Sequence, residues 1–144
     1  MRLVVDSNVL MRFFWQKSAT RSLLLKTGLD QLSVEFALQE IEKHRERICQ
    51  QTRISRQEFK EVKNELTTVV RFVPLGDYRE FLRKAGQVSP DPEDVDFFAL
   101  AMKIQAPLWS DEGRLKSQQA VRVCSTNDLL SDPEFLNLIY PDDG

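Results

Sequence analysis

The chain has 144 residues, of which 42% are hydrophobic and 29% charged, and its formal net charge is −2. This length predicts one domain over residues 1–144, large enough for a full hydrophobic core. The composition is that of an ordinary globular protein, and the small negative charge argues against a protein that binds nucleic acid through a broad basic surface.

Cysteine and histidine are too few for a disulfide framework or a zinc site. Cys49 and Cys124 form no Cys-x-x-Cys motif, and His44 is the single histidine. A metal would therefore be bound through oxygen, which favours Mg²⁺ or Mn²⁺. The first ten residues are interrupted by charge too early for a signal peptide, and no apolar run approaches the roughly 20 residues of a membrane helix. We expect a cytoplasmic protein with no membrane partner.

Short apolar runs alternate with helical patterns along the chain. Strands are predicted at "RLVV" (2–5), "QLSVE" (31–35), "RFVPL" (71–75), "APLW" (106–109) and "VRVC" (121–124), the last as an edge strand because it contains Arg122. Helices are predicted at 18–28, with Gly28 as the stop residue, and at 36–51, 55–70 and 92–104. The alternation predicts an α/β fold, a three-layer α/β/α sandwich around a mostly parallel sheet of four or five strands.

Acidic residues recur where such a sheet would gather a ligand. Asp6 follows the first strand, Asp111 and Glu112 follow the fourth, and Asp94 stands at the head of a helix whose next turns are apolar. Each has an ordinary explanation alone, since Asp6 could simply cap a helix. In a parallel sheet, however, the carboxyl ends of the strands meet at one edge. Carboxylates crowded there stay ionised only with a cation among them, which predicts a divalent metal site.

Glu40 is less distinctive than these acids. It lies on the helix predicted at 36–51, between Leu38 and Ile41, and therefore close to the buried stripe of that helix. An ordinary role is a pair with His44, four residues on.

Other acid-rich or phosphate-binding folds fit less well. Asp6 and Asn8 resemble the double-aspartate motif of haloacid-dehalogenase phosphatases, but Asn8 lacks the second carboxylate. A receiver domain needs an acceptor aspartate after a middle strand, and Asp77 follows its strand only after a gap. A nucleotide-binding domain is disfavoured because the five glycines form no phosphate-binding loop.

Four segments, in order and over nearly the whole chain, resemble the PIN-domain ribonucleases, the family that contains the VapC toxins of toxin–antitoxin pairs. They are "LVVDSNVL", "FALQEIEKH", "SPDPEDVDFFALAMKIQAPLWSDEGRLK" and "VRVCSTNDLL". The resemblance places the family's acids at Asp6, Glu40 and Asp94. At the fourth position the family usually has Thr or Ser, a variable residue and then Asp. The spacing from Ser110 selects Glu112, whereas the residue type selects Asp111, and we lean towards Asp111.

The resemblance implies a Mg²⁺- or Mn²⁺-dependent endoribonuclease, a hydrolase that cleaves single-stranded RNA, as the toxin of a type II toxin–antitoxin pair. The expected partners are RNA, an antitoxin protein and a second copy of the chain. The alternative is a non-catalytic PIN-fold module that binds RNA or protein. The implied catalytic residues are Asp6, Glu40, Asp94 and Asp111, the metal ligands are these four with Glu112, and the substrate-binding residues are Asn8, Ser110 and Arg12.

The segment after the first strand carries both basic and aromatic residues. Arg12, Lys17, Arg21 and Lys26 either line a path for RNA or form a solvated face. Phe13, Phe14 and Trp15 suit a dimer interface or an antitoxin groove, or else the core. We expect at least two of these three aromatic residues to be core.

Overall fold

The computed structural model describes residues 1–26 and 28–141, and its centre is a five-stranded sheet. The strands lie in the order β3-β2-β1-β4-β5, and every neighbouring pair is parallel. Their bounds are β1 (Arg2–Val5), β2 (Asp30–Val34), β3 (Arg71–Val73), β4 (Leu108–Trp109) and β5 (Val123–Cys124). The predicted parallel α/β fold is confirmed, and β5 is an edge strand as expected.

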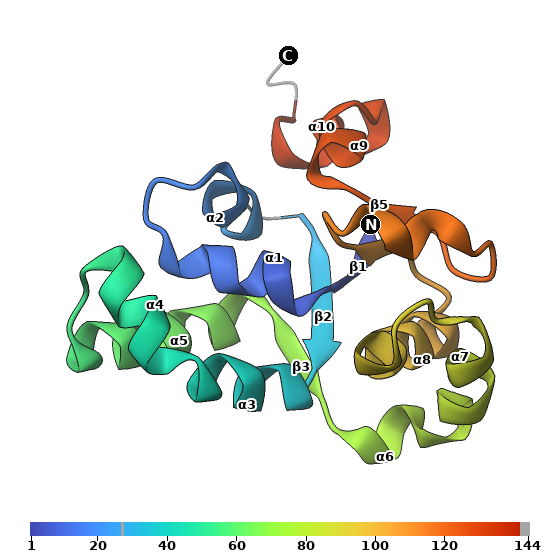
Figure 1. Ribbon diagram of the computed structural model, residues 1–144. Helices are drawn as coiled ribbons and strands as arrows, with labels where there is room; N and C mark the ends of the chain where they lie inside the picture. Colours follow the sequence, from blue (N-terminus) through green and yellow to red (C-terminus); the bar gives the residue numbers. More distant parts are fainter. Residues whose placement is uncertain (27, 142–144) are drawn as a thin grey trace.

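Helices cover both faces of the sheet (Figure 1). One group lies on the side of α1 (Ser7–Met11), with α2 (Ala19–Leu24), α3 (Phe36–Lys43), α4 (Arg45–Thr52) and α5 (Arg56–Val69). The other side carries α6 (Leu75–Tyr78), α7 (Leu82–Val88) and α8 (Val95–Ile104), and α9 (Thr126–Leu130) and α10 (Pro133–Ile139) follow β5. Short 3-10 helices span Arg12–Phe14, Arg79–Phe81, Pro92–Asp94 and Gly113–Ser117. Within the described ranges, no helix has both the length and the apolar character needed to span a membrane.

The core explains why the first strand is a continuous apolar run. Leu3, Val4 and Val5 are all fully buried, as expected for a central parallel strand with helices on both faces. Phe13 and Phe14 are also fully buried, which confirms that two of the three neighbouring aromatic residues belong to the core.

Three stretches differ from the predicted elements. The helix predicted at 36–51 is broken at His44 (φ −98°, ψ 13°) into α3 and α4, although neither glycine nor proline marks the break. The helix predicted at 18–28 ends as α2 at Leu24. Gly28 instead lies in the connection to β2 with φ +93°, where a Cβ would stand 3.0 Å from the carbonyl oxygen of Leu138, so glycine is needed there. The helices between Leu75 and Val88 were not predicted.

The strand order brings the ends of β1 and β4 together. From β1 the chain runs to β2 and β3 on one side of the sheet, and later crosses to β4 and β5 on the other side. The backbone N–H of Asp6 donates to the carbonyl oxygen of Trp109 at 3.0 Å, which ties the two strand ends together. This is the switch point at which open α/β sheets bind their ligands.

Candidate metal centre

Asp6 is fixed at the carboxyl end of β1 by two hydrogen bonds. Its Oδ1 accepts from the backbone N–H of Ser7 at 2.8 Å, so that it caps α1, and its Oδ2 accepts from the Ser110 hydroxyl at 2.6 Å. The residue is only 2% exposed. The predicted helix cap is therefore present, but it engages one oxygen and leaves the other facing the residues after β4.

Ser110 and Glu112 come from the chain that leaves β4. The Ser110 hydroxyl, which donates to Asp6, also accepts from the backbone N–H of Glu112 at 3.1 Å. The Glu112 backbone is extended (φ −84°, ψ 101°). Because alternate side chains of an extended chain lie on the same side, Ser110 and Glu112 both face Asp6.

Asp94 reaches the same place from the other helical layer. It ends a 3-10 turn and precedes α8, and it is 8% exposed. Its Oδ2 atom is buried and has no hydrogen-bond partner among the described residues. An unpartnered buried carboxylate oxygen is costly unless it faces a cation or carries a proton.

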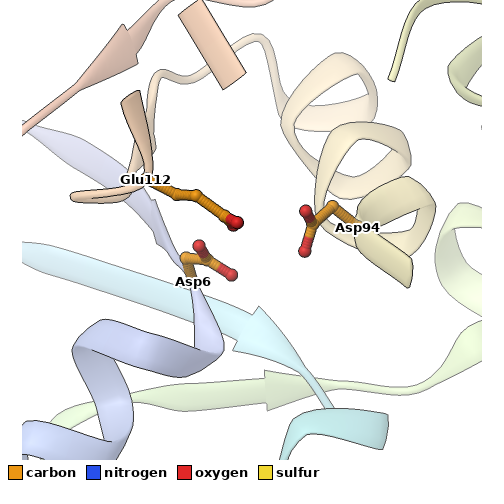
Figure 2. Close-up of side chains that lie close together, drawn as sticks. All are labelled: Asp6, Asp94 and Glu112. Carbon is orange, nitrogen blue, oxygen red and sulfur yellow. The ribbon is translucent and has the colours of Figure 1, made fainter. Parts of the chain in front are cut away.

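These three side chains form a cluster, defined here as Asp6, Asp94 and Glu112. One carboxylate oxygen from each lies within 4.8 Å of the others, and Figure 2 shows the carboxylates converging from separate segments. Burial, followed by repulsion from Asp6 and Glu112, raises the pKa of Asp94 to about 7. Burial also raises the pKa of Asp6, against the lowering effect of the Ser110 hydrogen bond. The three carboxylates therefore repel one another, and their all-oxygen donor set fits Mg²⁺ or Mn²⁺.

Asp111 does not join this cluster in the structure. Its Oδ1 accepts from the backbone N–H of Thr126 at 2.6 Å and its Oδ2 from the Thr126 hydroxyl at 2.8 Å. The same carboxylate pairs with Arg12. Our preference for Asp111 over Glu112 therefore disagrees with this geometry, because consecutive residues on an extended chain face opposite sides.

Glu40 and the substrate-binding candidates are not part of the cluster. Glu40 lies on α3 with its carboxylate 3.9 Å from the His44 imidazole, and it is absent from the group of carboxylates close enough to share an ion. The buried Oδ1 of Asn8 has no hydrogen-bond partner in the described residues. Arg12 is engaged by Asp111, and Ser110 is a buried hydrogen-bond bridge that is only 1% exposed. The roles predicted for these residues stay predictions.

Two other basic residues predicted for an RNA path are engaged within the fold. Arg21 pairs with Glu65 at 3.1 Å and covers the ring of Phe13, with its guanidinium carbon 4.3 Å from the ring centroid. Lys26 lies 4.8 Å from the centroid of the Tyr140 ring.

Arg114, which was not predicted from the sequence, is a neighbour of the cluster. Its guanidinium bonds the Glu112 carboxylate at 2.8 Å and 2.9 Å and also pairs with Asp91. These partners, Glu112 first, raise the pKa of Arg114. In the sequence, Arg114 is simply a basic residue two positions after Glu112. Its contact with Glu112 depends on the 3-10 helix at Gly113–Ser117, which the sequence did not predict.

Comparison with known proteins decides the family. The family model described as "PIN domain" matches residues 4–128, which is most of the chain. The chain is a PIN domain. PIN domains are generally nucleases, and the acidic cluster of this PIN domain lies within the matched residues. The family resemblance seen in the sequence is thus confirmed.

A solved structure supports the fold of this PIN domain. A chain in the crystal structure of VapBC2 from Rickettsia felis, bound to a DNA fragment from its promoter, superimposes with a TM-score of 0.60. The match covers 87% of this PIN domain and 98% of that chain, at 11% sequence identity. At this identity the likeness shows the fold alone. No curated protein matches the sequence.

Proposed function

We propose that this PIN domain is a metal-dependent endoribonuclease that hydrolyses phosphodiester bonds in single-stranded RNA. The observation that carries the proposal is the cluster itself, in which three carboxylates from three separate segments place oxygens within 4.8 Å of one another. A fold gains nothing in stability from such mutual repulsion, and carboxylates whose pKa values are raised by burial and by neighbouring acids are typical of functional sites.

Asp6, Asp94 and Glu112 would hold Mg²⁺ or Mn²⁺, with Asp94 offering the buried Oδ2 that has no partner in the described residues. The bound cation would supply positive charge to the scissile phosphate and lower the pKa of water. Asp94 must be deprotonated to serve as a ligand, and its pKa of about 7 makes this a titration near neutral pH.

The remaining residues of the site act by positioning the ligands. Ser110 holds the Asp6 carboxylate and the Glu112 backbone in one arrangement. Arg114 restrains the Glu112 side chain from the solvent side. Glu40 would act from the neighbouring helix α3, where it could orient water or a proton, a supporting role that the resemblance suggests.

The non-catalytic alternative is favoured by the unusual residue pair at the fourth acidic position and by the net charge of −2. The Glu112 carboxylate approaches Asp6 and Asp94 while Asp111 bonds elsewhere, which supports Glu112 as the fourth acid. This arrangement supports the enzyme over the binding module.

The further proposal is that this nuclease is the toxin of a toxin–antitoxin pair, with an antitoxin protein as partner and a homodimer as its assembly. The VapBC2 chain of similar fold comes from such a two-protein complex. A small open reading frame next to the gene whose product co-purifies with this chain would support the pairing, and a gene that stands alone would count against it.

Cleavage of a mixed single-stranded RNA pool tests the enzyme. We expect cleavage with Mg²⁺ or Mn²⁺, none with EDTA, and a loss of at least about a hundredfold in Asp6→Asn and Asp94→Asn. The matched control is Asp77→Asn, since Asp77 is exposed and has no side-chain hydrogen bond to a described residue. Cleavage that persists in EDTA, or that both cluster variants retain, would refute the proposal.

A further inference from the structure

A cavity lies on the α1 side of the molecule, between the end of α1 and the turn that joins α4 to α5. We refer to it as the α1 cavity. Its volume is about 930 Å³, within the range of small-ligand sites. Its lining includes Asn8, Met11, Trp15, Lys17, Arg53 and Ile54.

One residue that lines the α1 cavity follows Asp6 closely along the chain. Asn8 lines it, and Asn8 is in the first turn of α1, the helix that Asp6 caps. A strand whose phosphate lies at a cation held by Asp6 could therefore continue along α1 into this cavity.

The charge of the α1 cavity is positive in a chain whose net charge is −2. Arg12, Lys17 and Arg53 line it against a single acid, Glu58. Arg12 is paired with Asp111, whereas Lys17 and Arg53 are exposed and form no ion pair with any described residue. A second cavity of about 520 Å³, by contrast, balances two basic residues against two acids. The free cations of the α1 cavity favour a polyanion over an apolar peptide.

The walls of the α1 cavity suit a flat aromatic group. Trp15 is only partly buried, and the apolar side chains of Met11 and Ile54 also contribute to the lining. Single-stranded nucleic acid binds where aromatic side chains stack on bases and cations follow the backbone. Both features are present here.

We propose that the α1 cavity binds a nucleobase of the RNA strand, stacked on Trp15, with the flanking phosphates held by Lys17 and Arg53. This site extends the proposed nuclease function, since it sets how the strand enters and which bases are preferred near the cleaved bond. Arg12 stays with Asp111 in this arrangement.

Tryptophan fluorescence separates this site from the rest of the protein. The chain has two tryptophans, and Trp109 is fully buried, so a change on adding ligand reports on Trp15. We expect a short single-stranded RNA, added to wild-type protein in EDTA, to quench this emission. Trp15→Phe should lose the quenching yet bind labelled RNA within about twofold of wild type, because it keeps an aromatic face.

Variants of the lining test the contacts. We expect Trp15→Ala to weaken RNA binding by at least about fivefold, and Lys17→Ala and Arg53→Ala each to weaken it and reduce the salt slope by about one. Arg83→Ala is the matched control, because Arg83 is exposed on α7, in the other helical group, and pairs with no described acid. It should bind as wild type does. If Trp15→Ala unfolds, RNA binding by Lys17→Ala and Arg53→Ala still tests the proposal.

The outcomes distinguish this site from the proposed function. RNA that quenches Trp15 in EDTA but is not cleaved with Mg²⁺ or Mn²⁺ supports the site and refutes the nuclease. Cleavage with unchanged Trp15 emission and unchanged binding in Lys17→Ala and Arg53→Ala refutes the site and leaves the nuclease intact. If a co-purified partner protein quenches Trp15 and RNA does not, the α1 cavity is a protein-docking surface and the proposal is wrong.

Discussion

The Ser110 hydroxyl donates a 2.6 Å hydrogen bond to the carboxylate of Asp6, across 104 residues of sequence. Both residues are buried, and each follows one of two neighbouring strands, β4 and β1. The same hydroxyl accepts from the backbone N–H of Glu112, so one side chain aligns two members of the acidic cluster. The hydroxyl thereby fixes two carboxylates of the cluster at the switch point of the sheet.

Replacing Ser110 tests this positioning role. We expect Ser110→Ala to lower Mn²⁺ affinity about 10- to 100-fold while the far-ultraviolet circular dichroism stays unchanged, because partners behind metal ligands typically contribute that much. Ser110→Thr should recover part of the loss. Ser117→Ala, at an exposed serine of the following 3-10 helix, is the control and should bind Mn²⁺ normally.

Replacing Asp111 and Glu112 separately should give opposite results. Glu112→Gln should weaken Mn²⁺ binding about tenfold or more with little loss of stability, since it removes one ligand charge. Asp111→Asn should leave Mn²⁺ affinity within about twofold but lower the free energy of unfolding by about 1–3 kcal/mol, because its bonds to Thr126 and Arg12 are weakened. Glu93→Gln removes one negative charge at an exposed position outside the cluster, and it should bind Mn²⁺ as the wild type does. The reverse pattern would make Asp111 the ligand.

The raised pKa of Asp94 predicts an unusual pH dependence of stability in the metal-free protein. An unfolded aspartate titrates near about 3.9, whereas the folded Asp94 titrates near about 7, so the folded state holds its proton more tightly. In EDTA, stability should therefore fall as pH rises from about 4 to about 7, by up to about 4 kcal/mol, and level off above that.

Urea unfolding at pH 5 and pH 8 measures this dependence. Asp94→Asn should be more stable than the wild type at pH 8, and its stability should differ little between pH 5 and pH 8. Mg²⁺ should raise the stability of the wild type at pH 8 but not that of Asp94→Asn. Asp128, whose pKa is lowered to about 2 by its bond to Lys116, affects stability only as pH falls below about 4, so the two windows do not overlap. Wild-type stability that rises between pH 5 and pH 8 would contradict the prediction.

The central strands β1 and β4 were readable from the sequence because each is an apolar run followed by a polar residue, whereas β2 gave a weaker signal because it contains Gln31 and Ser33. The helices at 75–88 were not, since they are short and their burial is set by packing against α8 rather than by a long periodic face. Nothing local marks the break at His44.

Of the cluster, Asp6 and Asp94 could be located from their positions after a strand and before an apolar helix. The choice between Asp111 and Glu112 could not, because it depends on the extended backbone after β4, where one residue of shift reverses the direction of the side chain. The contact between Arg114 and Glu112 could not be predicted either, because it also depends on the local backbone, here the 3-10 helix at Gly113–Ser117.

We expect the Asp6–Asp94–Glu112 cluster to bind a divalent cation. Titration of Mn²⁺ into wild-type protein, Asp94→Asn and the control Asp77→Asn, followed by electron paramagnetic resonance of the free ion, measures this directly. We predict saturable binding by the wild type and the control, and affinity at least about tenfold lower in Asp94→Asn. Equal affinity in all three proteins, or no saturable binding by the wild type, would contradict the claim.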